Sequence, residues 1–118
     1  MFSIKVEANF SSAHNLRGYK GKCEELHGHN WKVEVSVSAR KLDKTGMLMD
    51  FKVLKNKLNC ILEQLDHKYL NNIPYFKKIN PTSENIAEYI YDRLKTAGVK
   101  AHSVTVWESE NSAATYYE

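Results

Sequence analysis

The sequence lacks the features that mark membrane-spanning and secreted proteins. Its longest run without Asp, Glu, Lys or Arg covers residues 8–16, whereas a membrane-spanning helix needs about 20 apolar residues. Lys5 and Glu7 interrupt the N-terminal segment, so a signal peptide is not expected. The two cysteines, Cys23 and Cys60, are too few for a disulfide framework. We therefore expect a protein of the reducing cytoplasm that makes no membrane contact.

Strong charge, linkers and repeats are also absent. The net charge is +3 over 118 residues, which by itself does not favour a nucleic-acid partner. The chain has two prolines and no low-complexity segment, and its 42% hydrophobic and 26% charged residues are typical of a folded protein. A chain of this length corresponds to one domain, which we expect to span residues 1–118.

Apolar and polar residues alternate in two long segments. Every second residue is apolar between Phe2 and Phe10, and again between Trp31 and Ala39. This period of two predicts two strands, each with one buried face. Shorter segments of the same kind, at residues 104–107 and 113–117, predict two further strands.

Helical spacing appears between these pairs of strands. Residues 51–65 carry apolar side chains at helical intervals, and Asp50 is placed to cap that helix. Pro81 is expected to open a second helix, with its apolar side at residues 86–94 and Gly98 as its stop. The order β-β-α-α-β-β predicts an α+β fold, a four-stranded antiparallel sheet with two helices on one face. The uncovered second face favours an oligomer.

Three histidines point to a metal site. His27 and His29 are two apart in an extended segment, so both side chains project to one side, the side of Trp31. His14 continues the buried parity of the first strand. Three neutral imidazoles from two adjacent strands would form a tetrahedral Zn²⁺ site with one open position, the arrangement typical of catalytic zinc. His102 has no such neighbours and is interpreted as an ordinary surface or core residue.

Cys23 lies four residues before His27, and its residue context leaves two roles open. As a fourth ligand it would close a structural zinc site. As a free thiol beside a divalent ion it would have a lowered pKa and could act as a base or nucleophile. Cys60, on the flank of the first helix, is interpreted as inert.

Two acidic residues are further candidates. Asp66 directly precedes His67, and a carboxylate can orient a histidine and raise its basicity, although such a pair also commonly ends a helix. Glu108 shares the parity of Val104 and Val106, which places its carboxylate on an apolar face where it needs a partner or a ligand. A frayed strand end would remove that requirement.

Taken together, six blocks of residues resemble the 6-pyruvoyl-tetrahydropterin synthase family, and most of all its 6-carboxy-5,6,7,8-tetrahydropterin synthase branch in queuosine biosynthesis. The blocks occur in the family's order and span essentially the whole chain; they are Phe-Ser-Ser-Ala-His (10–14), Cys-x3-His-Gly-His (23–29), Gly-Met-Leu-Met-Asp-Phe (46–51), Leu-Asp-His (65–67), Asn-Pro-Thr-Ser-Glu-Asn (80–85) and Val-Trp-Glu-Ser (106–109).

The resemblance implies a tunnelling fold (T-fold) whose subunits assemble into a barrel-like homo-oligomer, commonly a hexamer of two trimers, with active sites between subunits. By position, zinc would be held by His14, His27 and His29, and Cys23 would be the catalytic base. The remaining roles would be a proton relay at His67 with Asp66 behind it, an anchor for the pterin ring at Glu108, and further substrate contacts from Thr82, Ser83 and Glu84.

The implied reaction converts 7,8-dihydroneopterin triphosphate into 6-carboxy-5,6,7,8-tetrahydropterin with release of acetaldehyde and triphosphate. Three alternatives stay open. The same scaffold could form 6-pyruvoyl-tetrahydropterin. A zinc hydrolase could use metal-bound water with Glu108 as its base. A small zinc-stabilised binding module would use Cys23 as its fourth ligand and would have no catalytic activity.

Overall fold

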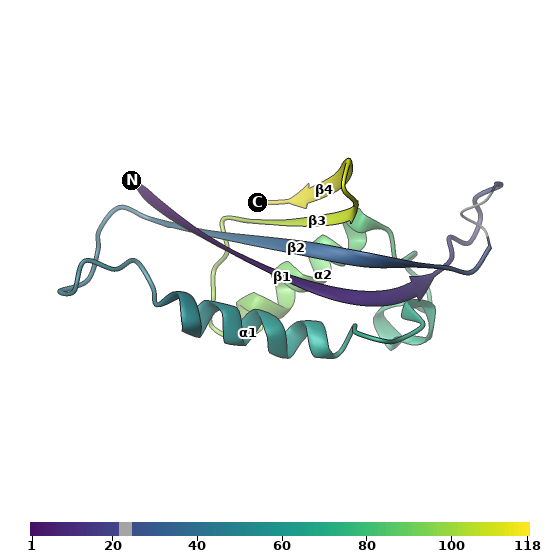
Figure 1. The fold of residues 1–118 in the computed structure, drawn as a ribbon, viewed down its shortest axis with the longest axis horizontal. Coiled ribbons are helices and arrows are strands. Elements are labelled where there is room, and N and C mark those ends of the chain that lie inside the picture. The colour runs from purple at the N-terminus through teal and green to yellow at the C-terminus, as the bar shows by residue number, and fades with distance from the viewer. Residues whose placement is uncertain (22–24) are drawn as a thin grey trace.

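The computed structural model describes residues 1–21 and 25–118 and confirms the predicted order of strands and helices (Figure 1). The strands and α-helices have these bounds: β1 Phe2–His14, β2 His27–Ala39, α1 Phe51–Glu63, α2 Ser83–Thr96, β3 Ser103–Ser109 and β4 Ser112–Tyr116. Two short 3-10 helices, η2 (Leu70–Asn72) and η3 (Pro74–Phe76), lie between α1 and α2. Cys23 lies outside the described residues.

The four strands form one antiparallel sheet in the order β1-β2-β3-β4, and both α-helices cover the same face of it (Figure 1). Helix α1 packs mainly against β1, and α2 packs against β3 and β4. The alternation of the sequence places Val33, Val35 and Val106 on this covered face, where all three are fully buried. The predicted α+β arrangement is therefore confirmed.

Both helices are amphipathic, which explains why each can cover the sheet. Their buried residues follow helical spacing; they include Leu54, Leu58, Ile61 and Leu62 in α1, and Ile86, Ala87, Ile90 and Leu94 in α2. The opposite sides carry charged residues. Among the described residues, no helix combines the length and the apolar character that crossing a membrane requires.

The helix ends follow capping rules, with one correction. Asp50 caps α1 as predicted, because its carboxylate accepts a hydrogen bond from the Lys52 amide at 2.8 Å. The prediction that Pro81 opens the second helix is wrong. Thr82 has an extended backbone and accepts from the Asn85 amide through its hydroxyl, so Thr82 is the N-cap and Pro81 precedes it. Gly98 has a φ of 88° and follows the end of α2, as predicted.

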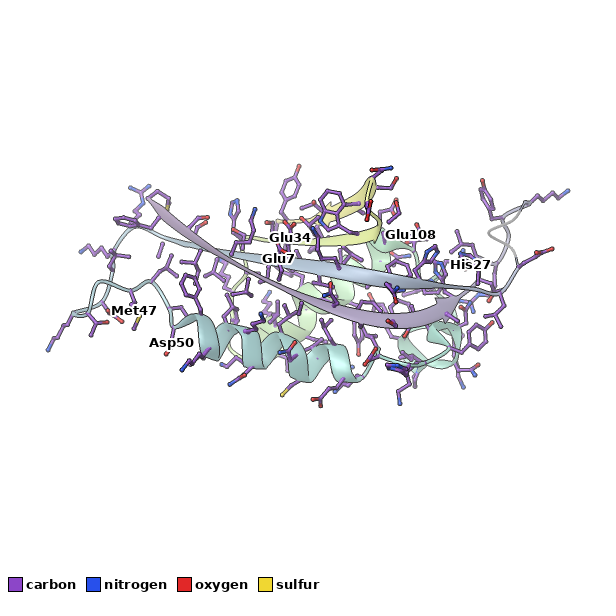
Figure 2. The ribbon with its side chains drawn as sticks, in the orientation of Figure 1. Glu7, His27, Glu34, Met47, Asp50 and Glu108 are labelled. Atoms are coloured by element: carbon purple, nitrogen blue, oxygen red, sulfur yellow. The ribbon has the colours of Figure 1, made fainter. Side chains whose placement is uncertain are left out.

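The second face of the sheet is polar. Lys5 and Lys32 each lie within ion-pair distance of Glu34, at 3.7 and 3.6 Å, and Glu7 stands directly opposite Glu34 in the β1–β2 register (Figure 2). A face of this kind is stable in water, so its lack of a covering layer does not by itself require an oligomer. The expectation of an oligomer on that ground is not supported, and the case for one depends on the functional site.

Candidate metal centre

The pairing of β1 with β2 brings the three predicted ligands together. His14 lies directly opposite His27, and Ser12 lies directly opposite His29. Because His14, His27 and His29 all share the parity of the covered face, their rings converge at one end of the sheet. Glu108, near the end of β3, lies at the same end (Figure 2). The strand adjacency that the histidine prediction required is therefore confirmed.

Four potential ligand atoms lie close together in this cluster. Nε2 of His14 is 3.0 Å from Nε2 of His27, and Oε1 of Glu108 is 2.8 Å from Nε2 of His29 and 3.7 Å from Nε2 of His14. All four ligand atoms lie within 4.8 Å of one another. Ligand atoms on a tetrahedral Zn²⁺ ion with bonds of about 2.0 Å are about 3.3 Å apart. The cluster thus fits a metal ion after small side-chain adjustments.

Hydrogen bonds to backbone carbonyls determine which ring nitrogens face the centre of the cluster. Nδ1 of His14 lies 2.7 Å from the carbonyl oxygen of Pro81, and Nδ1 of His27 lies 2.8 Å from that of Glu25. A carbonyl oxygen only accepts, so both Nδ1 atoms carry the proton and donate. In the neutral rings both Nε2 atoms are therefore bare acceptors. Two lone pairs facing each other at 3.0 Å repel, and either a metal ion between them or a proton on one ring removes that repulsion.

Electrostatics keeps the buried rings neutral, the state in which histidine binds a metal. Burial lowers the pKa of His14, and the neighbouring His27 and His29 lower it further, against the opposing effects of Pro81 and Glu108. Burial likewise lowers the pKa of His29. Nε2 of His29 is buried, and its neighbour among the described residues is the Glu108 carboxylate at 2.8 Å, whose charge opposes this lowering. Such a nitrogen is suited to a metal.

Trp31 packs against one side of the histidine cluster. Its ring is fully buried and makes edge contacts with His14 and His29, with ring centroids 5.0 and 5.2 Å apart. It also stacks on Phe10 at 5.7 Å, and its indole N–H donates to the Ser12 carbonyl at 3.3 Å. Both histidines are therefore held against a rigid aromatic surface, which restricts their rotamers.

Glu108 is placed by an irregularity between β3 and β4. Trp107 pairs with Ala113 and Ser109 with Ser112, so the register shifts by one residue at Glu108. The carboxylate side chain is 35% exposed and lies beside the histidines of the covered face. Its predicted parity is confirmed. The sequence did not indicate that Glu108 lies close to the metal ligands. The signal that could have indicated this is the parity that Glu108 shares with Val106, which pairs with Val33 of β2.

Asp66 and His67 occupy a different position, on the outer edge of β1. The Ser11 amide donates to Asp66 at 2.8 Å, and the His67 amide donates to the Ser11 carbonyl at 2.6 Å. Nδ1 of His67 lies 3.0 Å from the other carboxylate oxygen of Asp66, and the His67 side chain is 83% exposed. The carboxylate orients the imidazole as predicted, but the pair is not part of the histidine cluster of its own chain.

The segment predicted to contact substrate begins α2. The Thr82 hydroxyl caps the helix, Ser83 is buried, and Glu84 is exposed in the first turn. A hollow of about 270 Å³ lies beside the histidine cluster; it is lined by Ser11, Ser12, Gly28, His29 and Asn30. Ligand pockets usually enclose about 300–1,000 Å³, so this hollow is small for a pterin carrying a triphosphate.

Comparison with known proteins identifies one family. A model of the family described as 6-pyruvoyl tetrahydropterin synthase matches residues 3–118. A 6-carboxy-5,6,7,8-tetrahydropterin synthase from Synechocystis sp. is 43% identical over 123 aligned positions, which cover 99% of this chain and 94% of that protein. The human 6-pyruvoyl tetrahydrobiopterin synthase is 39% identical over 113 positions, covering 90% of this chain and 77% of that protein.

The structural comparison agrees with the sequence comparison. The structure of the Caenorhabditis elegans 6-pyruvoyl tetrahydropterin synthase superposes with a TM-score of 0.90 at 29% identity, covering 99% of this chain and 95% of that one. The predicted T-fold is confirmed by this likeness.

Proposed function

Since the chain belongs to the 6-pyruvoyl tetrahydropterin synthase family, we propose that it is the enzyme that converts 7,8-dihydroneopterin triphosphate into 6-carboxy-5,6,7,8-tetrahydropterin, with release of acetaldehyde and triphosphate. In this role it is a cytoplasmic carbon–carbon lyase that supplies a pterin for queuosine biosynthesis. The observation that carries the proposal is the pair of bare Nε2 atoms of His14 and His27, 3.0 Å apart, beside His29 and a carboxylate.

The proposed cofactor is Zn²⁺, held by His14, His27 and His29. When bound, it polarises the side-chain oxygens of the substrate and makes the neighbouring C–H more acidic. The chain favours the neutral state of the imidazoles through burial, sets their tautomer through carbonyl acceptors, and restricts their rotation through Trp31. Glu108 lies on the side of the cluster where the pterin is proposed to bind.

Cys23 is proposed as the base that moves the substrate proton. The three imidazoles supply the three protein ligands of a catalytic zinc site and leave the fourth position for the oxygens of the substrate. A closed structural site that uses Cys23 as its fourth ligand is therefore not needed to complete the coordination. A thiol near a divalent cation has a lowered pKa, which is the property that proton abstraction at neutral pH requires.

Asp66 and His67 are proposed to act in the active site of a neighbouring subunit. Asp66 and His67 lie beside the outer edge of β1, at one side of the sheet. Glu108 belongs to β3, which is next to β4, the strand at the opposite edge. The exposure of His67 and the small volume of the hollow beside His29 both favour a site completed by a second copy. We propose a homo-oligomer in which each site combines two subunits, and a hexamer of two trimers as its form.

Glu108 is proposed to anchor the pterin through its amino-pyrimidine edge, where two carboxylate oxygens match adjacent N–H donors. Thr82, Ser83 and Glu84 are proposed to add contacts. Of these three, Glu84 is the one whose side chain is free to reach a ligand, because the Thr82 hydroxyl caps α2 and Ser83 is buried.

A second product is favoured by one comparison. The human relative that is 39% identical is a 6-pyruvoyl tetrahydrobiopterin synthase. Formation of 6-pyruvoyl-tetrahydropterin would use the same metal centre and the same substrate, and would differ in the fate of the side-chain carbons.

Product analysis separates these reactions. The purified zinc-loaded protein is incubated with 7,8-dihydroneopterin triphosphate, and the products are identified by mass spectrometry, with His27→Ala as the matched inactive control. We expect the 6-carboxy product together with acetaldehyde. The 6-pyruvoyl product would assign the chain to the second reaction, and unchanged substrate in the presence of bound zinc would refute both.

A further inference from the structure

A hydrogen-bonded bracket at the start of α2 is not used by the proposed reaction. Asn80 accepts from the Arg17 amide at 2.9 Å and donates to the Arg17 carbonyl at 2.8 Å, so one side chain satisfies both backbone groups of a residue 63 positions away. Asn85 donates to the Asn80 carbonyl at 2.9 Å, and the Thr82 amide donates to the same oxygen at 2.9 Å. The backbone on both sides of Pro81 is therefore held in place.

The bracket leaves the carbonyl of Pro81 free for a histidine. The backbone amide of Asn85 donates to the Thr82 hydroxyl, and the backbone amide of Ile86 donates to the Thr82 carbonyl. These two hydrogen bonds of the first turn of α2 do not use the carbonyl oxygen of Pro81. Instead that oxygen accepts from Nδ1 of His14 at 2.7 Å, in a buried contact.

This contact determines which tautomer His14 adopts. With Nδ1 protonated, Nε2 is bare and faces Nε2 of His27 at 3.0 Å. Without a fixed acceptor at Nδ1, His14 could place its proton on Nε2 and donate it to the bare Nε2 of His27. The two rings would then satisfy each other, and a metal ion would have to displace that hydrogen bond before it could bind.

We propose that Asn80 is a positioning residue of the metal centre: by fixing the Pro81 peptide between Arg17 and Asn85, it holds His14 in the tautomer that binds the metal. This inference rests on the proposed metal centre and not on the identity of the pterin product. It gives the 80–85 segment a role in preparing the metal ligand, in addition to the proposed substrate contacts.

The test compares two substitutions of the bracket with a charge control. Asn80→Asp keeps the acceptor for the Arg17 amide and removes the donor to the Arg17 carbonyl, while Asn80→Ala removes both. Asn59→Asp introduces the same charge at an exposed position of α1. Zn²⁺ affinity is measured by chelator competition, and the tautomer of His14 in the metal-free protein is read from its ¹⁵N NMR shifts.

We expect Asn80→Asp to weaken Zn²⁺ binding about 10-fold, the lower end of the range for outer-shell partners of a metal ligand, and to convert part of the His14 signal to the Nε2–H form. Asn59→Asp should match the wild type in both readouts. Wild-type affinity and a fully Nδ1-protonated His14 in Asn80→Asp would overturn the inference, as would an equal loss in Asn59→Asp. If Asn80→Ala does not fold, the Asp variant still decides the question.

The Zn²⁺ affinity and the His14 tautomer can be measured whichever reaction the protein catalyses. Failure of the wild-type protein to convert the pterin substrate would refute the proposed function while leaving the affinity and tautomer measurements interpretable. Wild-type Zn²⁺ affinity and an unchanged His14 tautomer in Asn80→Asp, together with normal turnover of the wild-type protein, would refute this inference alone.

Discussion

Replacing His27 by Ala tests the metal centre through protein stability, without any assumption about substrate. A ligand that binds only the folded state stabilises it, by about 2.7 kcal/mol at a free concentration 100 times its Kd. For a chain of 118 residues, an unfolding entropy of about 2.1 cal/mol/K per residue converts this into a rise in Tm of about 11 °C. We expect zinc to raise the Tm of the wild-type protein by this amount.

The variant should lose most of that rise. His27 supplies one of the two bare nitrogens that face each other at 3.0 Å. Loss of an outer-shell partner already costs about 10- to 100-fold in metal affinity, so loss of a direct ligand should cost at least about 100-fold. At the same zinc concentration the stabilisation by bound zinc then falls to about 0.4 kcal/mol, which corresponds to a rise in Tm of about 2 °C.

The assay is thermal unfolding followed by circular dichroism, at a fixed protein concentration and with zinc or a chelator present. His102→Ala is the matched control, because His102 is exposed and lies outside the histidine cluster. It should keep the full wild-type rise. The assignment of the metal site fails if His27→Ala retains the wild-type rise in Tm, or if zinc does not stabilise the wild-type protein.

Three other substitutions test the remaining roles. Cys23→Ala should keep its zinc but lose about 10²- to 10⁴-fold in turnover; loss of zinc, measured by elemental analysis, would instead support a Cys23 ligand. Glu108→Gln should weaken pterin binding, measured by calorimetry, by about 2–4 kcal/mol, and unchanged affinity would remove Glu108 as the anchor. The Ser11 amide lowers the pKa of Asp66, so the stabilising effect of this carboxylate is complete above its ordinary pKa and disappears as the pH falls through the lowered value. Asp66→Asn should therefore be less stable than the wild type to urea at pH 7, and this difference should shrink as the pH falls below the ordinary carboxylate pKa; a difference that does not change with pH would contradict this.

Local patterns in the sequence predicted those features that depend on neighbouring residues. The alternation around Trp31 predicted β2 and its buried face, and the spacing of His27 and His29 predicted that both point to one side of it. The cap at Asp50 is equally local, because a carboxylate and an amide two residues away suffice to form it. The start of α2 was misplaced because Pro81 and Thr82 are both suited to a helix start, and only the hydrogen bond from Asn85 distinguishes them.

Tertiary structure decided which of these local features meet. The periodicity within one strand does not indicate which strand pairs with it. The pairing of His14 with His27 and the approach of Glu108 to His29 therefore come from the strand order of the sheet. The tautomer of His14 depends on a carbonyl 67 residues away, at Pro81. The sequence by itself therefore determined which side chains face the interior, because that follows from the geometry of a single strand or helix. The metal centre needed the folded sheet, because its distances are set by contacts between segments far apart in the chain.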